Sequence, residues 1–427
     1  MVIVGGIIVV LTIVAIIKRW EVRLVLFTSG ALMAILSKNP FGAVTYFTSA
    51  SGMVNAGLVT VICITMGFAY VLKLTECDAH LINAIVRPLS KLEKILIPGT
   101  VIITAAINIA LPSAAGVSAA VGAILIPALI AAGVNPAMAA SAVMAGTFGS
   151  VMSPGSAHVV MVADLAKMEI MEIVGVVALK VVVAVIIGAA ALTIFAFIRK
   201  ESKGYVAAAG DYVAKDLSSF KVNPLKAIIP VVPLVILIVT SSAMPYNGKE
   251  GLFTTAVTVP QAMFIGIILA GLVSLKNPQD VSRNFFQGVG AAYADVIGII
   301  ACAAVFTGGM QAIGLTPALI KAMEGSDTVV SIASTFGPMV VAVLSGSGDA
   351  ATLAFNQAIT PHAATFGMEI SSLGTTASLA GALGRTMSPV AGAAIICAGL
   401  AKVNPIEITK RNAIGMVIAA VVTMIMV

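Results

Sequence analysis

The chain carries the same unusual pattern twice, once near its middle and once near its end. A Ser-Pro dipeptide stands at 153–154 and again at 388–389, and in each case a lysine, Lys167 or Lys402, follows thirteen residues after the proline. The repetition indicates two related halves, each with a Gly/Ser/Pro-rich interruption in apolar sequence. This combination is the best sequence indication of a transporter whose site lies between its repeats. A second spacing of fourteen residues recurs upstream, from Ser113 to Pro127 and from Ser347 to Pro361.

The composition places these halves in a lipid bilayer. Hydrophobic residues make up 59% of the chain and charged residues 10%, and the mean hydropathy is +1.10, whereas an ordinary soluble domain has about 25% charged residues. The net charge of +6 comes from basic residues scattered between apolar spans, so we do not expect nucleic acid as a partner. There is no GxxxxGK[ST] pattern for binding nucleoside phosphates. Energy for any pumping must therefore come from an ion gradient or from the substrate itself.

The sequence gives little indication of enzymatic chemistry. The cysteines are dispersed and show neither a disulfide framework nor the spacing of a metal site, and no nucleophile and base converge in the sequence. We therefore predict no cofactor and no enzyme activity. A passive channel is the other class of protein to consider. Hairpins and broken helices in the centre of the protein would occlude a pore, which favours a carrier. The four cysteines are Cys63, Cys77, Cys302 and Cys397.

Two stretches do not fit simple membrane crossings. Residues 95–131 and 327–363 are each too long for one helix of about 20 residues and short for two, and LPSAAG and SGSGD interrupt them halfway. We predict re-entrant hairpins, because non-helical backbone at membrane depth is tolerated only where it lines protein or water. The following helices, 137–165 and 371–401, are broken by the Ser-Pro dipeptides. The predicted fold is an all-α integral membrane protein with two inverted-topology repeats, each of five transmembrane helices plus one re-entrant hairpin, with broken helices at the midplane.

Loop charge predicts the orientation. Basic residues recur in alternate loops, and the positive-inside rule places those loops in the cytoplasm. The first repeat, 1–200, then begins outside and the second, 227–427, begins inside, while 201–226 forms a cytoplasmic linker. We predict a multi-pass protein of the inner (plasma) membrane with both termini outside the cytoplasm. The basic loops lie at 18–23, 87–94, 199–203 and 402–411.

The hairpin tips and helix breaks supply the candidate substrate site. Hydroxyl groups there can bond a ligand that has shed its water, and the free N–H groups of half-helices that start after the tips suit a carboxylate. Proline in each break frees further backbone groups. The alternatives are that small residues only let helices pack closely and that the prolines only kink them. The candidate substrate-binding residues are Ser113, Gly116, Ser153, Ser156, Ser345, Ser347, Gly348, Arg385, Thr386 and Ser388.

Charged residues inside apolar spans are the candidates for binding a substrate carboxylate and for coupling to a cation. An intramembrane arginine is costly unless it faces a polar cavity, and the planar fork of Arg385 matches a carboxylate; a structural ion pair with Asp349 or Asp295 is the alternative. Asp349, Asp295 and Asn108 are candidates for coupling to H⁺ or Na⁺, and we place a possible Na⁺ site near Ser113, Ser347 and Asp349. His158 and His362 lie near the breaks, where histidine can act as a titrating group, although a structural role is the simpler interpretation.

Three segments together resemble a known family. GSGDAATLAF at 346–355, LGRTMSPVAGAA at 383–394 and AGLAKVNPIEITKR at 398–411 look like the C-terminal region of the DcuC-type anaerobic C4-dicarboxylate carriers. The resemblance spans the chain and is strongest over 284–412. It implies a secondary carrier of the ion-transporter superfamily with inverted repeats and paired hairpins. It also implies a homodimer in which a scaffold domain supports a moving transport domain, as in an elevator mechanism.

Two places depart from that family's pattern. The family carries asparagine where this chain has Asp349, and it reads Ser-Ser-Ala-Thr-Gly where this chain has PSAAG at 112–116. The expected function is secondary active transport of a C4-dicarboxylate of the succinate, fumarate and malate class, either coupled to H⁺ or Na⁺ or by exchange. Arg385 would hold one carboxylate and the tips the other. Because one arginine accounts for only one carboxylate, a carrier of an amino acid or another small organic anion is the alternative.

Overall fold

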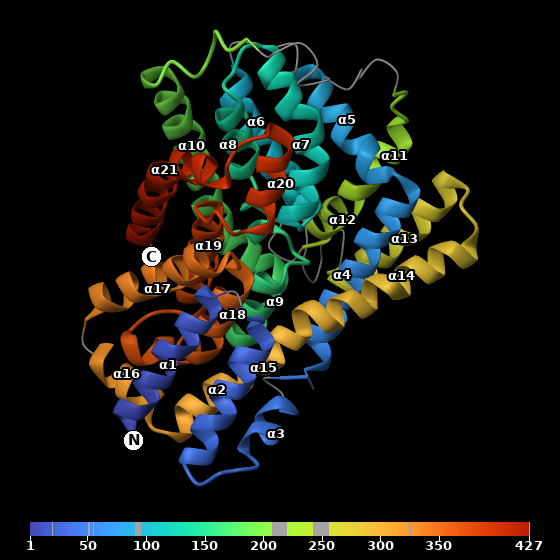
Figure 1. Ribbon diagram of the computed structural model, residues 1–427. Coiled ribbons are helices and arrows are strands. Elements are labelled where there is room, and N and C mark those ends of the chain that lie inside the picture. The colour runs from blue at the N-terminus through green and yellow to red at the C-terminus, as the bar shows by residue number, and fades with distance from the viewer. Residues whose placement is uncertain are drawn as a thin grey trace.

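The computed structural model describes residues 1–18, 20–49, 52–53, 55–89, 95–206, 220–241, 256–323 and 326–426. Over these residues the chain is helical without strands (Figure 1), which confirms the predicted all-α class. Six helices are long and apolar enough to cross a membrane, consistent with an integral membrane protein. They are α4 (Ala56–Thr75), α7 (Ala114–Ala131), α10 (Ile170–Ile198), the stretch Pro278–Ala312, α17 (Asp327–Ser345) and α21 (Pro405–Ile425). Parts of the predicted linker 201–226 and of the basic loops at 18–23 and 87–94 lie outside the described residues.

The order of elements recurs in the two halves. In each, a pair of helices joined by a tight turn is followed by an interrupted helix and then by a long final helix. The first half also contains α1 (Val2–Ile17), α2 (Val22–Leu36), α3 (Gly42–Phe47), α5 (Cys77–Leu89), α6 (Leu96–Ala110), α8 (Pro136–Ala145), η2 (Gly149–Met152) and α9 (Ala157–Ala166). The second half also contains α11 (Pro224–Ile228), η3 (Ile229–Val231), α12 (Val232–Thr240), α13 (Val259–Ser274), α14 (Pro278–Ala292), η4 (Tyr293–Ile297), α15 (Gly298–Ala312), α16 (Leu315–Met323), α18 (Gly348–Ala358), η5 (Thr360–Phe366), α19 (Ile370–Thr386) and α20 (Gly392–Ala401).

The repeated lysines have a structural explanation. Lys167 ends α9 and Lys402 ends α20, and both adopt the left-handed conformation, with φ of 55° and 51°. A residue in this conformation is a common way to stop a helix, because it turns the chain and satisfies the last carbonyl groups. The matched spacing after each Ser-Pro dipeptide therefore comes from the same local structure in both halves: a break, a ten-residue helix and a left-handed cap.

The two halves are packed into each other (Figure 1). Helix α7 of the first half lies against α20 of the second, and α18 of the second lies against α9 of the first. Helices α2 and α15 approach so closely that a Cβ on Gly30 would overlap the Val305 carbonyl, and one on Gly309 would overlap the Gly30 carbonyl. The largest buried apolar cluster joins α6, α7, α8 and α10 to α19, α20 and α21, whereas a separate cluster joins α4, α13 and α14–α15.

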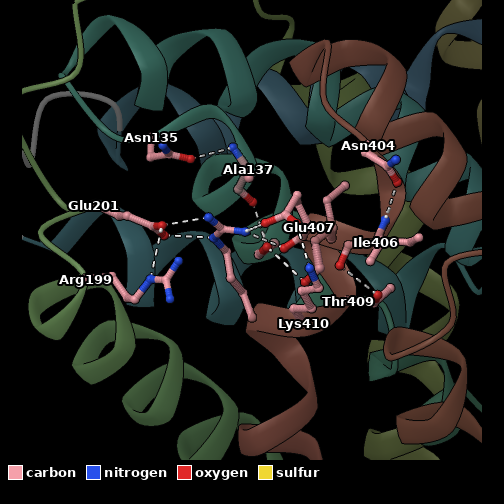
Figure 2. Close-up of polar contacts among 12 residues, drawn as sticks. Asn135, Ala137, Arg199, Glu201, Asn404, Ile406, Glu407, Thr409 and Lys410 are labelled. Atoms are coloured by element: carbon pink, nitrogen blue, oxygen red, sulfur yellow. Dashed lines mark hydrogen bonds and ion pairs between the residues drawn. The ribbon is translucent and has the colours of Figure 1, made fainter.

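The final helices of the two halves are joined by a buried ionic cluster (Figure 2). Arg411, near the start of α21, donates from Nε to Glu201 Oε2 over 2.8 Å and from Nη2 to Glu201 Oε1 over 2.6 Å. Its Nη1 also reaches Glu407 Oε2 at 3.0 Å. Glu201 follows the end of α10, and its carbonyl accepts the N–H of Asn135 before α8. Both side chains of the Arg411–Glu201 pair are nearly buried, with 7% and 11% exposed.

Candidate functional site

The first tight turn connects α6 to α7. Ser113 caps α7, because its Oγ accepts the Gly116 N–H over 3.1 Å. Asn108, which is fully buried, donates from Nδ2 to the Leu111 carbonyl over 3.0 Å and accepts the Ser150 N–H at Oδ1 over 2.8 Å. Asn108 therefore fastens this tip to the interrupted region between α8 and α9. Its proposed role in cation coupling stays a prediction beside this structural one.

The second tight turn connects α17 to α18. Ser347 caps α18 by accepting the Ala350 N–H over 3.2 Å, and Ser345 Oγ accepts the Ser347 N–H over 3.2 Å. Gly346 between them has φ +78°, which favours glycine. A Cβ at Gly346 would lie 2.9 Å from the backbone of Val390 and Ala391. The second tip thus rests directly on the second helix break.

Replacing Gly346 with alanine should displace this tip. The left-handed conformation costs a non-glycine residue about 1–2 kcal/mol, and the added methyl group also meets backbone atoms that cannot rotate away. Gly367→Ala is the matched control, because Gly367 has φ +72° and open space around its Cβ position. In thermal unfolding of the purified protein, we expect Gly346→Ala to melt lower than Gly367→Ala. Equal melting temperatures would show that the tip does not depend on this contact.

The helix breaks bring buried hydroxyl groups next to the tips. Ser153 ends η2, and Ser156 caps α9 by accepting the Val159 N–H over 3.4 Å. In the second break, Thr386 donates to the Leu383 carbonyl over 2.7 Å, and Ser388 Oγ accepts the Val390 N–H over 3.4 Å. All four side chains are buried. The hydroxyl groups of Ser156, Thr386 and Ser388 therefore bond the backbone of the breaks.

Arg385 reaches across the boundary between the halves. It lies in the last turn of α19, and its Nη2 donates to the carbonyl of Thr147, in the first break, over 2.7 Å. Its Nε is buried without a hydrogen-bond partner among the described residues. No carboxylate in the described chain lies within 4.0 Å of its guanidinium. At the start of α18, a Cβ on Gly348 would lie 2.9 Å from the Gly381 carbonyl oxygen, so glycine there allows α18 to approach α19 closely.

Asp349 pairs with a histidine and not with the arginine. His158 Nε2 lies 2.8 Å from Asp349 Oδ1, with side-chain exposures of 5% and 51%. Arg385 still acts on Asp349 electrostatically from nearby. The ring nitrogen Nδ1 of His158 is buried and has no partner in the described part of the chain. The structure therefore gathers Asp349, Arg385 and His158, and no sequence pattern had indicated that the histidine pairs with Asp349.

Asp295 is placed differently. It lies in the single π-turn η4, its side chain is 74% exposed, and its ion-pair partner is Arg23 Nη1 at 3.8 Å. Arg23 also donates to the Ala294 carbonyl over 2.8 Å. These contacts tie Asp295 to the start of α2, and no contact in the described chain joins it to the tips or breaks. Coupling through Asp295 stays a prediction that these contacts do not support.

The sequence reasoning missed Thr65 beside the first tip and first break, and it missed Lys180 as a buried charge in α10. Thr65 of α4 lines a small open cavity together with Pro112 of the first tip and Ser153 and Pro154 of the first break. The Thr65 hydroxyl is buried without a partner among the described residues. Lys180 is buried in α10 and donates from Nζ to Thr376 Oγ1 over 2.9 Å. A single lysine inside a long apolar helix is a signal that could have identified Lys180.

Lys180→Met should leave the protein at least as stable as the wild type. Lys180 has only neutral partners, Thr376 and Ser372, in the described structure, and burying an ammonium without a counter-charge is costly. Methionine keeps most of the volume and removes the charge. Lys180→Ala is the control, because it removes the charge but leaves a cavity, which typically costs a few kcal/mol. A methionine variant that melts as low as the alanine variant would contradict this account.

The comparisons with known proteins agree with this picture. A family model described as the C4-dicarboxylate anaerobic carrier, DcuC, matches residues 3–427. An uncharacterized transporter of Haemophilus influenzae is 40% identical over 273 residues, covering 63% of this chain and 96% of that protein. The anaerobic C4-dicarboxylate transporter DcuC of Escherichia coli K12 is 26% identical over 96% of this chain and 94% of its own.

A solved structure extends the comparison to the fold. The structure of Neisseria gonorrhoeae MtrF, described as illuminating a class of antimetabolite efflux pumps, has a TM-score of 0.64 with 14% identity, covering 92% of this chain and 83% of that chain. At this identity the likeness concerns the fold alone. The family match covers nearly the whole sequence, and the matched family consists of transporters and not enzymes. The chain therefore belongs to the DcuC family of C4-dicarboxylate anaerobic carriers.

Proposed function

We propose that this protein is a secondary active carrier of a C4-dicarboxylate of the succinate, fumarate and malate class in the inner membrane. The observation that carries the proposal is the guanidinium of Arg385, which lies between the two halves with a buried and unpartnered Nε. An unpaired buried donor on a cation is costly. A substrate carboxylate would supply the missing acceptor and a negative charge in direct contact with the guanidinium.

The second carboxylate would bind at the hairpin tips. Helices α7 and α18 both begin there with serine caps, and the first turn of a helix presents unpaired N–H groups and the positive end of its dipole. In this proposal, hydroxyl groups of the two breaks would add hydrogen bonds to the substrate. They are those of Ser153, Ser156, Thr386 and Ser388. The coupling ion in this proposal is H⁺ or Na⁺, with Asp349, Ser113 and Ser347 as its candidate ligands.

The arrangement of helices supports the proposed inverted repeats. Helices α10 and α21 hold the same position in their halves, and the residue that follows the end of α10, Glu201, contacts Arg411 near the start of α21. The two helices therefore run in opposite directions. Helix α18 has 11 residues and is about 16 Å long at 1.5 Å per residue, too short for a hydrocarbon core of about 30 Å. This length supports a re-entrant hairpin whose tip stops at membrane depth.

An elevator-type movement is part of the proposal. One buried cluster joins α6, α7 and α8 to α19 and α20, together with α10 and α21, and a second joins α4, α13 and α15 to Val160 and Met161 of α9 and Leu353 of α18. In our proposal the 95–165 and 327–401 elements move together against the remaining helices. We also propose a homodimer held by the immobile part, with both chain termini outside the cytoplasm.

One observation favours a second candidate substrate. Asp349 is half exposed and lies close to Arg385, so the pair could receive the ammonium and carboxylate groups of an amino acid such as aspartate. Uptake of radiolabelled succinate into proteoliposomes, driven separately by sodium and proton gradients, tests both candidates. Inhibition by fumarate but not by acetate would support the dicarboxylate, whereas inhibition by aspartate alone would support the amino acid. Flux that does not saturate would indicate a channel and contradict both.

A further inference from the structure

Thr65 is a buried polar residue on a helix that carries none of the proposed ligands. Helix α4 runs from Ala56 to Thr75, so Thr65 lies halfway along it and, in a membrane-spanning helix, near the middle of the bilayer. Thr65 is 5% exposed, and its hydroxyl has no hydrogen-bond partner among the described residues. Because a buried hydroxyl without a partner is costly, this hydroxyl is a candidate for binding a ligand.

The other two threonines of α4 bond to the helix itself. The hydroxyl of Thr60 donates to the Ala56 carbonyl over 2.6 Å, and that of Thr75 donates to the Val71 carbonyl over 2.8 Å. A bond to the carbonyl four residues earlier is a common way for a helical threonine to satisfy its hydroxyl. Thr65 does not make this bond, so its hydroxyl remains available to an acceptor outside the helix.

The side chain of Thr65 points at the first helix break. A Cβ on Gly155 would overlap both Cγ2 and Oγ1 of Thr65, so both branches of the threonine lie against this glycine. Thr65 also lines the small open cavity to which Pro112, Ser153 and Pro154 contribute. Thr65 therefore faces the same tip and the same break that carry proposed ligands for the substrate.

The lining of this cavity suits one end of a dicarboxylate. Its walls include Phe68 and Leu72 of α4 and Met263 of α13, and its hydroxyl-bearing residues are Thr65 and Ser153. Sites for small molecules are typically apolar with a few polar groups that fix the orientation of the ligand. The walls can pack against methylene carbons, and a hydroxyl can donate to a carboxylate oxygen. Helix α7 begins at the first tip beside this cavity, and its N-terminus favours negative charge.

We propose that Thr65 binds the substrate and that its hydroxyl donates to the second carboxylate of the dicarboxylate. This inference rests on the proposed function and adds to it a ligand from a helix outside the hairpins and breaks. The acceptor that the Thr65 hydroxyl lacks is then supplied by the substrate. Removing a hydrogen bond to a charged group weakens binding by roughly tenfold or more, so the hydroxyl should contribute measurably to the affinity.

Calorimetric titration of the purified protein with succinate tests this proposal. Thr65→Val keeps the shape of the side chain and removes the hydroxyl, and we expect the dissociation constant to rise roughly tenfold. Thr65→Ser keeps the hydroxyl and should bind succinate nearly as tightly as the wild type. Thr60→Val is the matched control on the same helix, because the Thr60 hydroxyl bonds to the Ala56 carbonyl, and it should leave the dissociation constant unchanged. An unchanged dissociation constant in Thr65→Val would overturn the proposal.

The melting temperature without substrate separates binding from a structural role. Thr65→Val removes a buried hydroxyl that has no partner in the described chain, so it should melt at least as high as the wild type while binding succinate more weakly. A lower melting temperature together with weaker binding, both restored in Thr65→Ser, would assign Thr65 a structural role and overturn the proposal.

Two further outcomes also have a definite meaning. If Thr65→Val does not fold, Thr65→Ala gives the same comparison with Thr65→Ser, because alanine adds no bulk against Gly155. If the wild type does not bind succinate at all, that result contradicts the proposed function and this inference with it. Wild-type binding that is unaffected by loss of the Thr65 hydroxyl overturns this inference alone.

Discussion

Arg385→Lys should reduce succinate transport by about 100-fold while the protein remains folded. Lysine keeps the positive charge, but its ammonium cannot reproduce the planar fork that lets arginine bind a carboxylate with two parallel hydrogen bonds. It would also lose the bond from Nη2 to the Thr147 carbonyl. Charge-assisted hydrogen bonds contribute about 1.5–3 kcal/mol each, and 2.8 kcal/mol corresponds to about 100-fold. Initial rates of uptake, normalised to the amount of reconstituted protein, give the comparison.

Arg283→Lys is the control for this experiment. Arg283 lies on α14 with an exposed side chain, so the same chemical change there should leave the uptake rate near that of the wild type. Thermal unfolding should show that both variants fold. If Arg385→Lys transported succinate at the wild-type rate, Arg385 would not bind the substrate, and the proposed site would have to be placed elsewhere.

Glu201→Ala should have the largest effect on stability. It removes the main partner of Arg411 and leaves a nearly buried cation with Glu407 as its remaining carboxylate (Figure 2). Removing one member of a buried ion pair typically costs 3–5 kcal/mol, and we expect about 3 kcal/mol here because Glu407 remains. The loss should appear as a lower melting temperature in detergent, and adding Arg411→Met in the double variant should restore much of it.

A nearby exposed pair provides the comparison. Lys410 Nζ lies 3.0 Å from Glu407 Oε1, and the lysine side chain is 64% exposed. Exposed ion pairs contribute less than about 1 kcal/mol, so Lys410→Ala should leave the melting temperature almost unchanged. If Lys410→Ala and Glu201→Ala lowered the melting temperature equally, the buried Arg411–Glu201 pair would contribute no more to stability than an exposed pair.

The sequence predicted the elements that depend on local chemistry. The all-α class followed from the apolar composition, and the family followed from the segments at 346–355, 383–394 and 398–411. Half-helices were expected to start just after the tips, and α7 and α18 begin there, capped by Ser113 and Ser347. Such features depend on residues close together in the chain, which a sequence pattern can reveal.

Contacts between distant residues could not be read from the sequence. His158 and Asp349 are 191 positions apart, and Arg385 and Thr147 are 238 apart. The first pairing depends on how α9 and α18 pack, and the second on how α19 packs against the first break. No spacing along the chain encodes either arrangement. Asp295 is another such case: a carboxylate in an apolar stretch indicates function, and its contact with Arg23, at the start of α2 and 272 positions away, could not be read from the sequence.

Succinate counterflow is the most direct test of a dicarboxylate site between the two halves, because it requires no assumption about the coupling ion. Proteoliposomes loaded with unlabelled succinate are diluted into a trace of radiolabelled succinate without any ion gradient. The account predicts transient accumulation of label above its external concentration, inhibition by fumarate, and loss of the signal in Arg385→Lys. No accumulation with folded wild-type protein, or accumulation that Arg385→Lys leaves intact, would contradict it.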